Sequence, residues 1–425
     1  MNRSPTSFLL MLLVSAILVL GAALAQAGLS RLDPPSPWPS VGLLLGVFWA
    51  GWLLSLLCRP PGDFLLLPLA TLLCSVGWLE VYRLGPAISA PALGERQAWW
   101  IALGILVFVL ILFVPGDYRV LEDYKYSCLL IGVFLQLAVM LFGIEINGAR
   151  LWFEIGPLLF QPVEVVKILL VVFLAAFLRQ FRHWIRLGLL SPEGRLPRKA
   201  LLLLGLGWAC AEGVLVLQKD LGMALLLFGI FLSMFFLSTG RRDLVALSAV
   251  LAGLGSWACY HLFSHVRVRV GAWLNPFADP HGQGYQMSQA LYALASGGLD
   301  GSGLGMGRPF LVPEAYTDFI FVAVAEEWGM LGALGVLIVY MMLITRAFRI
   351  SLWAGDEFGT LLAAGLATLL AWQTLILVGG TVQLAPMTGI TLPFMSYGGS
   401  SMLANFLILG ILWRISAVGE VSGGD

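Results

Sequence analysis

Charged residues are scarce in this sequence. Asp, Glu, Lys and Arg make up 11% of the 425 residues, whereas about 25% is usual for a soluble domain. Acidic and basic residues balance at 24 each, so there is no basic excess of the kind that indicates nucleic-acid binding. No stretch is both long and polar enough to form a separate cytoplasmic domain.

Cysteine and histidine are also rare, and neither occurs in a disulfide or metal-binding pattern. The four histidines are scattered along the chain, so no histidine-based metal site is indicated. Each cysteine lies inside an apolar run without C-x-x-C spacing, which is typical of a small buried hydrophobe. The cysteines are Cys58, Cys74, Cys128, Cys210 and Cys259.

Long apolar runs are abundant instead: 59% of the residues are hydrophobic, and the mean hydropathy is +0.91. Runs of about 20 apolar residues cross a bilayer as helices, which satisfy their own backbone hydrogen bonds there. We therefore predict an all-α fold, a polytopic membrane helical bundle with about 12 transmembrane helices. The expected spans are 7–27, 41–58, 63–84, 97–115, 126–143, 163–178, 199–217, 222–239, 243–263, 319–346, 358–384 and 401–416.

The distribution of Lys and Arg predicts the orientation of these spans. With both termini in the cytoplasm, 15 basic residues lie inside and 8 outside, as the positive-inside rule requires. The loop 179–199 contributes most to this asymmetry. The long loop at about 264–318 and the segments 144–162 and 385–400 then lie outside, and 385–400 is polar enough to enter the membrane only if protein surrounds it.

The first span has an alternative interpretation. Arg3, an apolar run and the segment Ala23–Ala27 resemble a secretory signal with its cleavage site. The apolar run is long for a signal, which favours a retained helix. Cleavage would leave eleven spans with the same orientation.

Charged residues near the outer surface are candidate site residues. Glu164 and Lys167 are three residues apart, share one helix face and can pair, either as structure or as part of a function. Arg150 precedes Trp152 outside the membrane. It could anchor the chain at the interface, which is the commoner role, or bind phosphate through its guanidinium.

The long outer loop contains two further patterns. Asp279 lies before Pro280 in an ordinary turn sequence, although a carboxylate there could also remove a proton from a hydroxyl group. The glycine-rich segment 297–307 lacks the context and the Lys-Ser/Thr ending of a phosphate loop, which favours a mobile loop.

Polar residues also open the last spans. Asp318 could cap the span that carries the adjacent acids Glu326 and Glu327, and at most one of these two acids is expected to face a given cavity. Small residues open the final span and would suit either an anion at a helix start or close helix packing. They are Ser396, Gly398, Gly399, Ser400 and Ser401.

Taken in order, these segments resemble the shape, elongation, division and sporulation (SEDS) family, the group that contains RodA and FtsW. The resemblance runs from about Tyr126 to Ile415, some two-thirds of the chain. Its motifs are Asn147-Gly148-Ala149-Arg150, Gln161-Pro162-x-Glu164-x-x-Lys167, Gln218-Lys219-Asp220-Leu221-Gly222, Asp279-Pro280-x-Gly282-x-Gly284-Tyr285-Gln286, Pro313-Glu314-x-x-Thr317-Asp318-Phe319-Ile320-Phe321, Glu326-Glu327-x-Gly329 and, most specific, Leu392-Pro393-Phe394-Met395-Ser396-Tyr397-Gly398-Gly399-Ser400-Ser401.

The resemblance implies a GT-C-like helical bundle that polymerises lipid II into peptidoglycan glycan strands, by inverting glycosyl transfer at the outer face of the bacterial cytoplasmic membrane. It implies Asp279 as the general base, Arg150 as a pyrophosphate contact, and Glu164 and Lys167 as a functionally sensitive pair. A divalent cation, Mg or Mn, is expected as cofactor. The implied partners are lipid II and a class B penicillin-binding transpeptidase, with no nucleic acid.

The family usually has ten spans, so we divide the chain into N-terminal helices at 1–96, two of them additional, and a core at 97–425. Three positions depart from the family pattern: Leu151 stands for a second arginine, Val163 for a serine and Lys219 for a proline. Two other functions stay open. A lipid II flippase would also use intramembrane charges, and a non-catalytic scaffold for the transpeptidase would tolerate loss of the outer acids.

Overall fold

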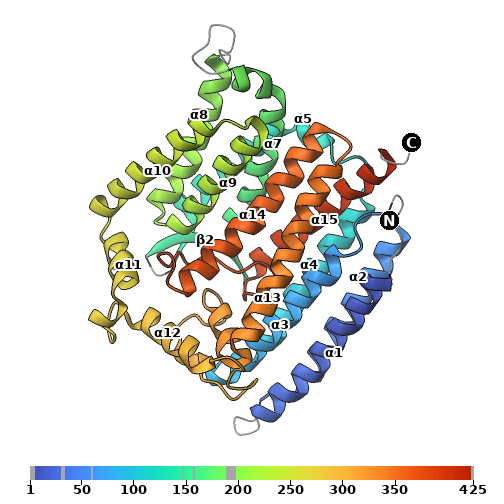
Figure 1. Cartoon of the computed structure of the whole chain (residues 1–425), viewed down its shortest axis with the longest axis vertical. Helices are drawn as coiled ribbons and strands as arrows, with labels where there is room; N and C mark the ends of the chain where they lie inside the picture. Colours follow the sequence, from blue (N-terminus) through green and yellow to red (C-terminus); the bar gives the residue numbers. More distant parts are fainter. Residues whose placement is uncertain are drawn as a thin grey trace. The chain divides into compact units, whose positions relative to one another are not determined.

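The computed structural model describes residues 5–29, 34–58, 61–146, 148–156, 158–187 and 198–422. Helices dominate these residues (Figure 1). Asn147 and residues 188–197 of the basic loop lie outside the described residues. The long helices are α1 (Pro5–Gly28), α2 (Trp38–Leu57), α3 (Leu66–Ala87), α4 (Leu93–Phe113), α6 (Lys125–Phe142), α7 (Val163–Leu187), α8 (Arg198–Leu217), α9 (Leu221–Thr239), α10 (Arg242–Leu262), α13 (Ile320–Trp353), α14 (Glu357–Thr381) and α15 (Gly399–Ser422).

Each predicted span corresponds to one of these helices, which confirms the polytopic helical membrane fold. Within the described residues, 10 helices are long and apolar enough to cross a membrane. The two that fall short are α7, which carries Glu164, Lys167 and several arginines, and α8, whose apolar part is only Leu204–Leu217. Paired or end-positioned charges therefore lower the hydropathy of α7 without changing its helical structure.

Contacts divide the chain into two compact units. The first comprises Met1–Val114, Arg267–Arg346 and Gln373–Ala417, and the second comprises Pro115–Val266, Ala347–Trp372 and Val418–Asp425.

In the first unit, α3 is buried along almost its whole length and packs against both α1 and α4. The N-terminal helices α1 and α2 also contact each other (Figure 1). Gly21 of α1 allows a close approach to α3, because a β-carbon there would overlap the side chain of Leu79. The helix α1 is therefore an integral part of this packing.

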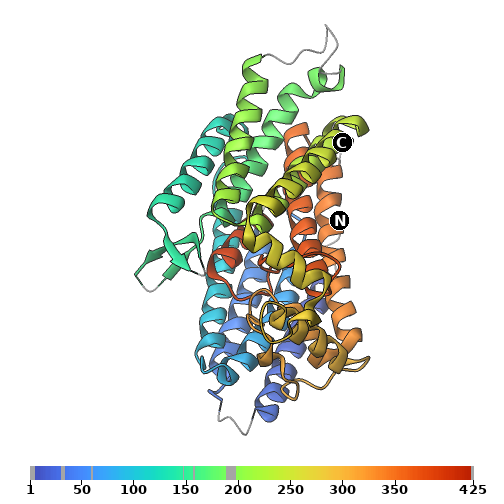
Figure 2. The same cartoon turned by 90° about the vertical axis from the view of Figure 1, so that its left-hand side faces the viewer.

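In the second unit, α7 packs against α6 and α9, and α8 also contacts both α6 and α9. A small antiparallel sheet in the order β1 (Ile144–Ile146), β2 (Ala149–Ile155) and β3 (Leu158–Phe160) connects α6 to α7 (Figure 2). The sequence pattern indicated only an outer loop here. Gly148 and Gly156 adopt positive φ at the two turns, and this backbone conformation suits hairpins.

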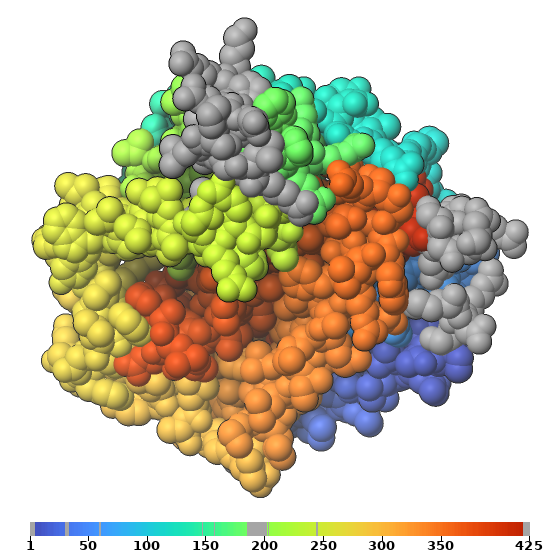
Figure 3. All heavy atoms as spheres, turned by 45° about the horizontal axis from the view of Figure 1, so that its top comes forward, coloured from blue at the N-terminus to red at the C-terminus, as the bar shows by residue number. Residues whose placement is uncertain are grey.

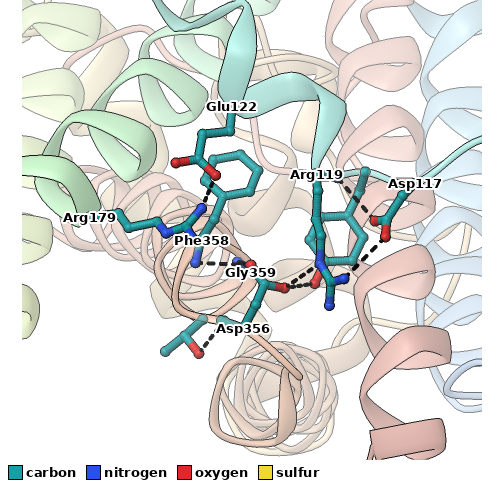
Figure 4. Close-up of polar contacts among 9 residues, drawn as sticks. Asp117, Arg119, Glu122, Arg179, Asp356, Phe358 and Gly359 are labelled. Carbon is teal, nitrogen blue, oxygen red and sulfur yellow. Dashed lines mark hydrogen bonds and ion pairs between the residues drawn. The ribbon is translucent and has the colours of Figure 1, made fainter.

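A polar network on α14 stabilises the second unit. Asp356 precedes the first turn of α14, where its carboxylate accepts hydrogen bonds from the N–H groups of Phe358 and Gly359, both at 3.1 Å (Figure 4). The Tyr118 hydroxyl and Arg119 Nε also donate to Asp356 Oδ1, the latter over 3.1 Å. Burial favours the protonated acid, but these donors outweigh it and lower the pKa of Asp356 below its ordinary value.

Two arginines of α7 extend this network. Arg179 pairs with Glu122 of the short helix α5 (Val120–Asp123), as Figure 4 shows. Arg182 donates to the carbonyl of Ser238 over 2.8 Å and pairs with Glu357 at 3.2 Å. The basic end of α7 is thus tied to α5, α9 and α14.

We expect Asp356→Asn to lower the free energy of unfolding by about 2 kcal/mol, because several donors would lose a charged acceptor. The folded-state pKa is lowered, so this contribution is fully present above about pH 4 and is lost as the pH falls through the folded-state pKa. Thermal denaturation in detergent at neutral and acidic pH would measure it. The control is Asp117→Asn, whose carboxylate is 39% exposed and pairs with Arg119 at 3.5 Å. A loss equal to that of Asp356→Asn would contradict this role of Asp356.

Candidate functional site

The turn around Asp279 is the first element of the candidate site. It lies between α11 (Ser264–Leu274) and α12 (Tyr285–Gly297), directly after a 3-10 turn at Pro276–Ala278. The Gln283 N–H donates to Asp279 Oδ2 over 3.0 Å. The Asp279 carbonyl accepts from the N–H groups of Gly282 and Gly284 at 3.2 and 3.0 Å. The aspartate is exposed, so a firmly oriented carboxylate is presented at the surface.

Two glycines of this turn are required by close contacts. A β-carbon at Gly282 would overlap the Asp279 carboxylate, and one at Gly284 would overlap the carbonyl oxygen of Pro276. The Ser288 hydroxyl donates to the same carbonyl over 3.1 Å. The spacing Asp-Pro-x-Gly-x-Gly is therefore the pattern that lets the chain fold tightly around the aspartate.

The helices on either side of the turn are fastened to other parts of the same unit. Trp273 of α11 and Gln383 exchange two hydrogen bonds, at 3.0 and 2.7 Å. Arg269 donates to the Thr388 carbonyl over 3.3 Å. Figure 3 shows this side of α11 in yellow against the red segment that follows α14. These bonds fix the approach of α11 to the Asp279 turn.

The other flanking helix, α12, packs into an apolar cluster. Gln286 donates to the Pro313 carbonyl over 3.2 Å, which fixes the start of α12. The long loop at about 264–318 consequently contains two ordered helices, α11 and α12. Members of the buried cluster are Leu84, Met287, Ala290, Ala293, Val312, Ala315, Phe319, Val322 and Ala323.

Residues 392–396, shortly before α15, are buried and non-helical. Irregular polar backbone can lie at membrane depth only where protein surrounds it. The Ser396 hydroxyl donates to the Thr317 carbonyl over 2.5 Å and accepts from the Leu392 N–H over 2.8 Å. Gln97 donates to the Ser396 carbonyl over 3.2 Å, and the Tyr397 N–H donates to the Tyr316 carbonyl over 2.9 Å. This segment therefore joins the loop before α13 to the start of α15.

Asp318 and the small residues at the start of α15 belong to the same region. A β-carbon on Gly389 would lie 3.5 Å from an Asp318 carboxylate oxygen, which places Asp318 beside the 385–390 segment. Asp318 lies two residues before the start of α13 at Ile320, and the capping role proposed for it stays a prediction. Gly399 packs directly against the ring of Trp100, whereas Gly398 has room around it. Ser400 lies in the first turn of α15 and makes a polar contact.

Tyr316 supplies a hydroxyl group beside this region. Its ring lies 5.9 Å from that of Tyr397, centroid to centroid. Burial, with the neighbouring Glu314 carboxylate, raises the pKa of Tyr316 to about 12. The hydroxyl therefore stays protonated at neutral pH and can donate a hydrogen bond to an anionic oxygen.

A buried charge cluster contains two residues that sequence reasoning missed as a site. Arg83 of α3 forms an ion pair with Glu327 and donates to the Gly307 carbonyl. Glu80, one turn earlier, accepts from the Trp328 indole N–H over 2.7 Å. The i, i+3 spacing of two ionisable residues within an apolar span was the available signal, the same one that marks Glu164 and Lys167.

The adjacent acids of α13 bind the same glycine-rich segment. Glu326 Oε1 accepts from the Arg308 N–H over 2.7 Å, and Glu327 Oε2 accepts from the Gly305 N–H over 3.0 Å. Glu327 lines the cavity beside α1 and Glu326 does not, which agrees with the prediction that at most one of the two acids faces a given cavity. The segment curls around both acids, so neighbouring positions on the helix can be reached from different sides.

A break in α13 explains how this segment is held. Gly329 has φ 69° and ψ −174°, so the helix is kinked there. The carbonyl oxygens of Glu326 and Glu327 accept instead from the N–H groups of Ser302 and Gly303, at 2.9 and 3.0 Å. The glycine-rich segment is therefore anchored, and the mobile loop predicted from its composition is wrong.

The remaining candidates belong to the second unit. Lys167 Nζ lies 2.5 Å from Glu164 Oε2, and the two side chains are 0% and 1% exposed. Arg150 pairs with Glu145 directly across β1 and β2 at 3.4 Å, with both side chains more than half exposed. The Glu164–Lys167 pair is a buried structural unit. The Arg150 guanidinium is exposed, and its pair with Glu145 contributes little stability, so it is accessible to a ligand.

Known proteins resemble this chain over most of its length. The family profile described as "Cell cycle protein", which covers FtsW, RodA and SpoVE, matches residues 64–420. Peptidoglycan glycosyltransferase RodA of Mycobacterium tuberculosis is 40% identical over 428 residues, which cover 96% of this chain and 89% of that protein. Stage V sporulation protein E of Bacillus subtilis is 33% identical over 366 residues, which cover 83% of this chain and 96% of that protein.

Solved structures show the same fold. A chain from a study of structural coordination of polymerization and crosslinking by a peptidoglycan synthase complex superposes with a TM-score of 0.68 at 30% identity, covering 86% of this chain and 99% of that one. RodA of Thermus thermophilus gives a TM-score of 0.61 at 28% identity, with the same coverage. The helices α1 and α2 precede the residues that the family profile matches, and the domain division at residue 96 stays a prediction.

We expect Arg83→Leu to destabilise the protein by about 3–5 kcal/mol, because it leaves the buried Glu327 without its cation. The double variant Arg83→Leu/Glu327→Leu should recover part of this loss, since it buries no unpaired charge from that pair. Thermal unfolding in detergent measures both, with Arg96→Leu as a control at an exposed arginine. Equal stability of Arg83→Leu and Arg96→Leu would refute the role of the pair.

Proposed function

The chain belongs to the cell cycle protein family that comprises FtsW, RodA and SpoVE and is a peptidoglycan glycosyltransferase, and we propose how its residues carry out that reaction. The substrate is lipid II. The sugar 4-hydroxyl of one lipid-linked unit attacks the anomeric carbon of another, with inversion at that carbon. The new glycosidic C–O bond forms as the bond to undecaprenyl pyrophosphate breaks.

Asp279 is the general base of this reaction. It accepts the proton that leaves the attacking hydroxyl, while its orientation is kept by the Gln283 N–H on Oδ2. The single observation that carries this assignment is an exposed carboxylate held by a turn whose glycines fit closely around it. Such positioning is what general-base catalysis needs, because the carboxylate must be within hydrogen-bond reach of the hydroxyl.

The leaving pyrophosphate requires positive charge. Arg150 carries an accessible guanidinium on β2 and is the proposed phosphate contact. Lys167 is already neutralised by Glu164, so we assign this pair to the support of the α7 start. In the first unit, Asp318, Glu327, Ser396, Gly398, Gly399 and Ser400 support the loops that face the substrate.

A divalent cation, Mg or Mn, also belongs to the proposal. Within the described residues no group of three or more His, Cys, Asp or Glu side chains could hold a metal ion. Magnesium is often held by one or two carboxylates together with substrate phosphates. We propose that the cation arrives with the pyrophosphate, where it would neutralise charge on the leaving group.

The protein is a multi-pass membrane protein. We propose that it lies in the bacterial cytoplasmic membrane with both termini inside, and that the Asp279 turn acts on the outer face. The similarity to a chain from a peptidoglycan synthase complex supports a class B penicillin-binding transpeptidase as partner.

We expect Asp279→Asn to reduce lipid II polymerisation by at least about a hundredfold, since a general base typically contributes 10²–10⁴-fold. Purified protein with a class B transpeptidase, lipid II and Mg²⁺ or Mn²⁺ would be assayed for glycan strands on gels. Glu95→Gln, an exposed acid at the start of α4, should retain wild-type activity.

Equal polymer from Asp279→Asn and wild type would remove Asp279 as the base. No polymer from wild type, with a known polymerase active in parallel, would favour a flippase or a scaffold. The buried Glu164–Lys167 pair suits the flippase, and vesicles that report lipid II translocation would then test it.

Two glycine substitutions test whether the position of the Asp279 carboxylate matters for the reaction. We expect Gly282→Ala to lower kcat roughly tenfold or more, because the new methyl group displaces the Asp279 carboxylate from its working position. Gly271→Ala in α11 is the matched control, since nothing lies within 4 Å of a β-carbon there. Identical kcat values for the two folded variants would show that the turn geometry does not matter.

A further inference from the structure

A groove lies between α1 and the glycine-rich segment of the first unit. Its volume is about 480 Å³, within the range of small-molecule sites. One wall consists of apolar side chains of α1, and the opposite wall includes Leu304 and Trp328. Leu20 and Leu24 are 63% and 61% exposed. In a membrane protein, such a surface faces lipid.

The apolar wall has the length of one lipid chain. It runs from Leu13 to Leu24 along α1, which corresponds to about 16 Å at 1.5 Å per residue. This is roughly half of the 30 Å hydrocarbon thickness of a bilayer. The groove therefore matches an acyl chain of the leaflet on the side of the long loop.

One end of the groove is acidic. Asp300, which is exposed, and Glu327, which is buried, both line it beside the Trp328 ring. Arg83 offsets only one of these carboxylates. An excess of negative charge next to an indole favours a cation.

Close backbone packing preforms this end of the groove. A β-carbon on Gly28 would lie 2.9 Å from the Leu304 carbonyl oxygen, and one on Gly305 would lie 3.2 Å from Gly28 Cα. Gly305 also donates to Glu327 over 3.0 Å. The end of α1, the glycine-rich segment and the carboxylate are thus fixed together before any ligand binds.

We propose that this groove binds a phospholipid whose headgroup carries an ammonium group. One acyl chain lies along α1, and the ammonium group rests between the Asp300 carboxylate and the Trp328 ring. A phosphatidylglycerol headgroup is anionic and has no ammonium group, so it would leave the carboxylates without a counter-charge. This binding is independent of glycosyl transfer.

Native mass spectrometry of the full chain, titrated with phosphatidylethanolamine or phosphatidylglycerol of identical acyl chains, tests the proposal. Wild type should bind phosphatidylethanolamine roughly fivefold more tightly, as expected for one partly exposed carboxylate and one aromatic contact. Asp300→Asn should reduce this preference to less than about twofold, whereas Glu95→Gln should keep it.

A second pair of variants tests the apolar wall. Ala16→Trp should fill the groove and weaken binding of both lipids, whereas Leu12→Trp, at an exposed position of α1 outside the lining, should not. Equal affinity of wild type for the two lipids, or a preference that survives Asp300→Asn, overturns the proposal. A dimer mass that disappears in Ala16→Trp would assign the groove to a second copy of the chain instead.

Discussion

An ionised side chain in the interior of a membrane protein needs a partner, because hydrocarbon offers no water to solvate it. The Arg83–Glu327 pair meets this requirement between α3 and α13. The same two side chains bind the backbone at Gly307 and Gly305. A structural need for neutrality thereby fixes the glycine-rich segment, and with it the end of the long loop at about 264–318.

The candidate catalytic turn relies on such fixed surroundings. Asp279 is exposed, so side-chain packing does not fix it. Its orientation comes from hydrogen bonds with the backbone of its own turn. Its flanking helix α11 is tied to Gln383 and α12 to the core beneath Pro313. The proposed base is thus a surface residue on a rigid frame, which suits an enzyme whose lipid-linked substrates approach from the membrane.

Apolar runs were sufficient to predict the long helices, since their period and length are local properties. The motifs also identified Asp279, Ser396 and the Glu164–Lys167 pair as residues of interest. The role of Arg83 was missed because its partner, Glu327, is distant in sequence. The anchored state of the segment 297–307 was missed for the same reason: its hydrogen bonds go to α13, and composition alone suggested mobility.

In the proposed mechanism, Asp279 moves a proton and does not bind the substrate in its ground state. Equilibrium binding of a fluorescent lipid II to wild type and to Asp279→Asn, measured in the same detergent as turnover, tests this most directly. We predict dissociation constants that agree within about twofold while turnover is lost in the variant, because a general base acts in the transition state. Loss of binding in parallel with turnover would contradict this mechanism and would make Asp279 a substrate-binding residue.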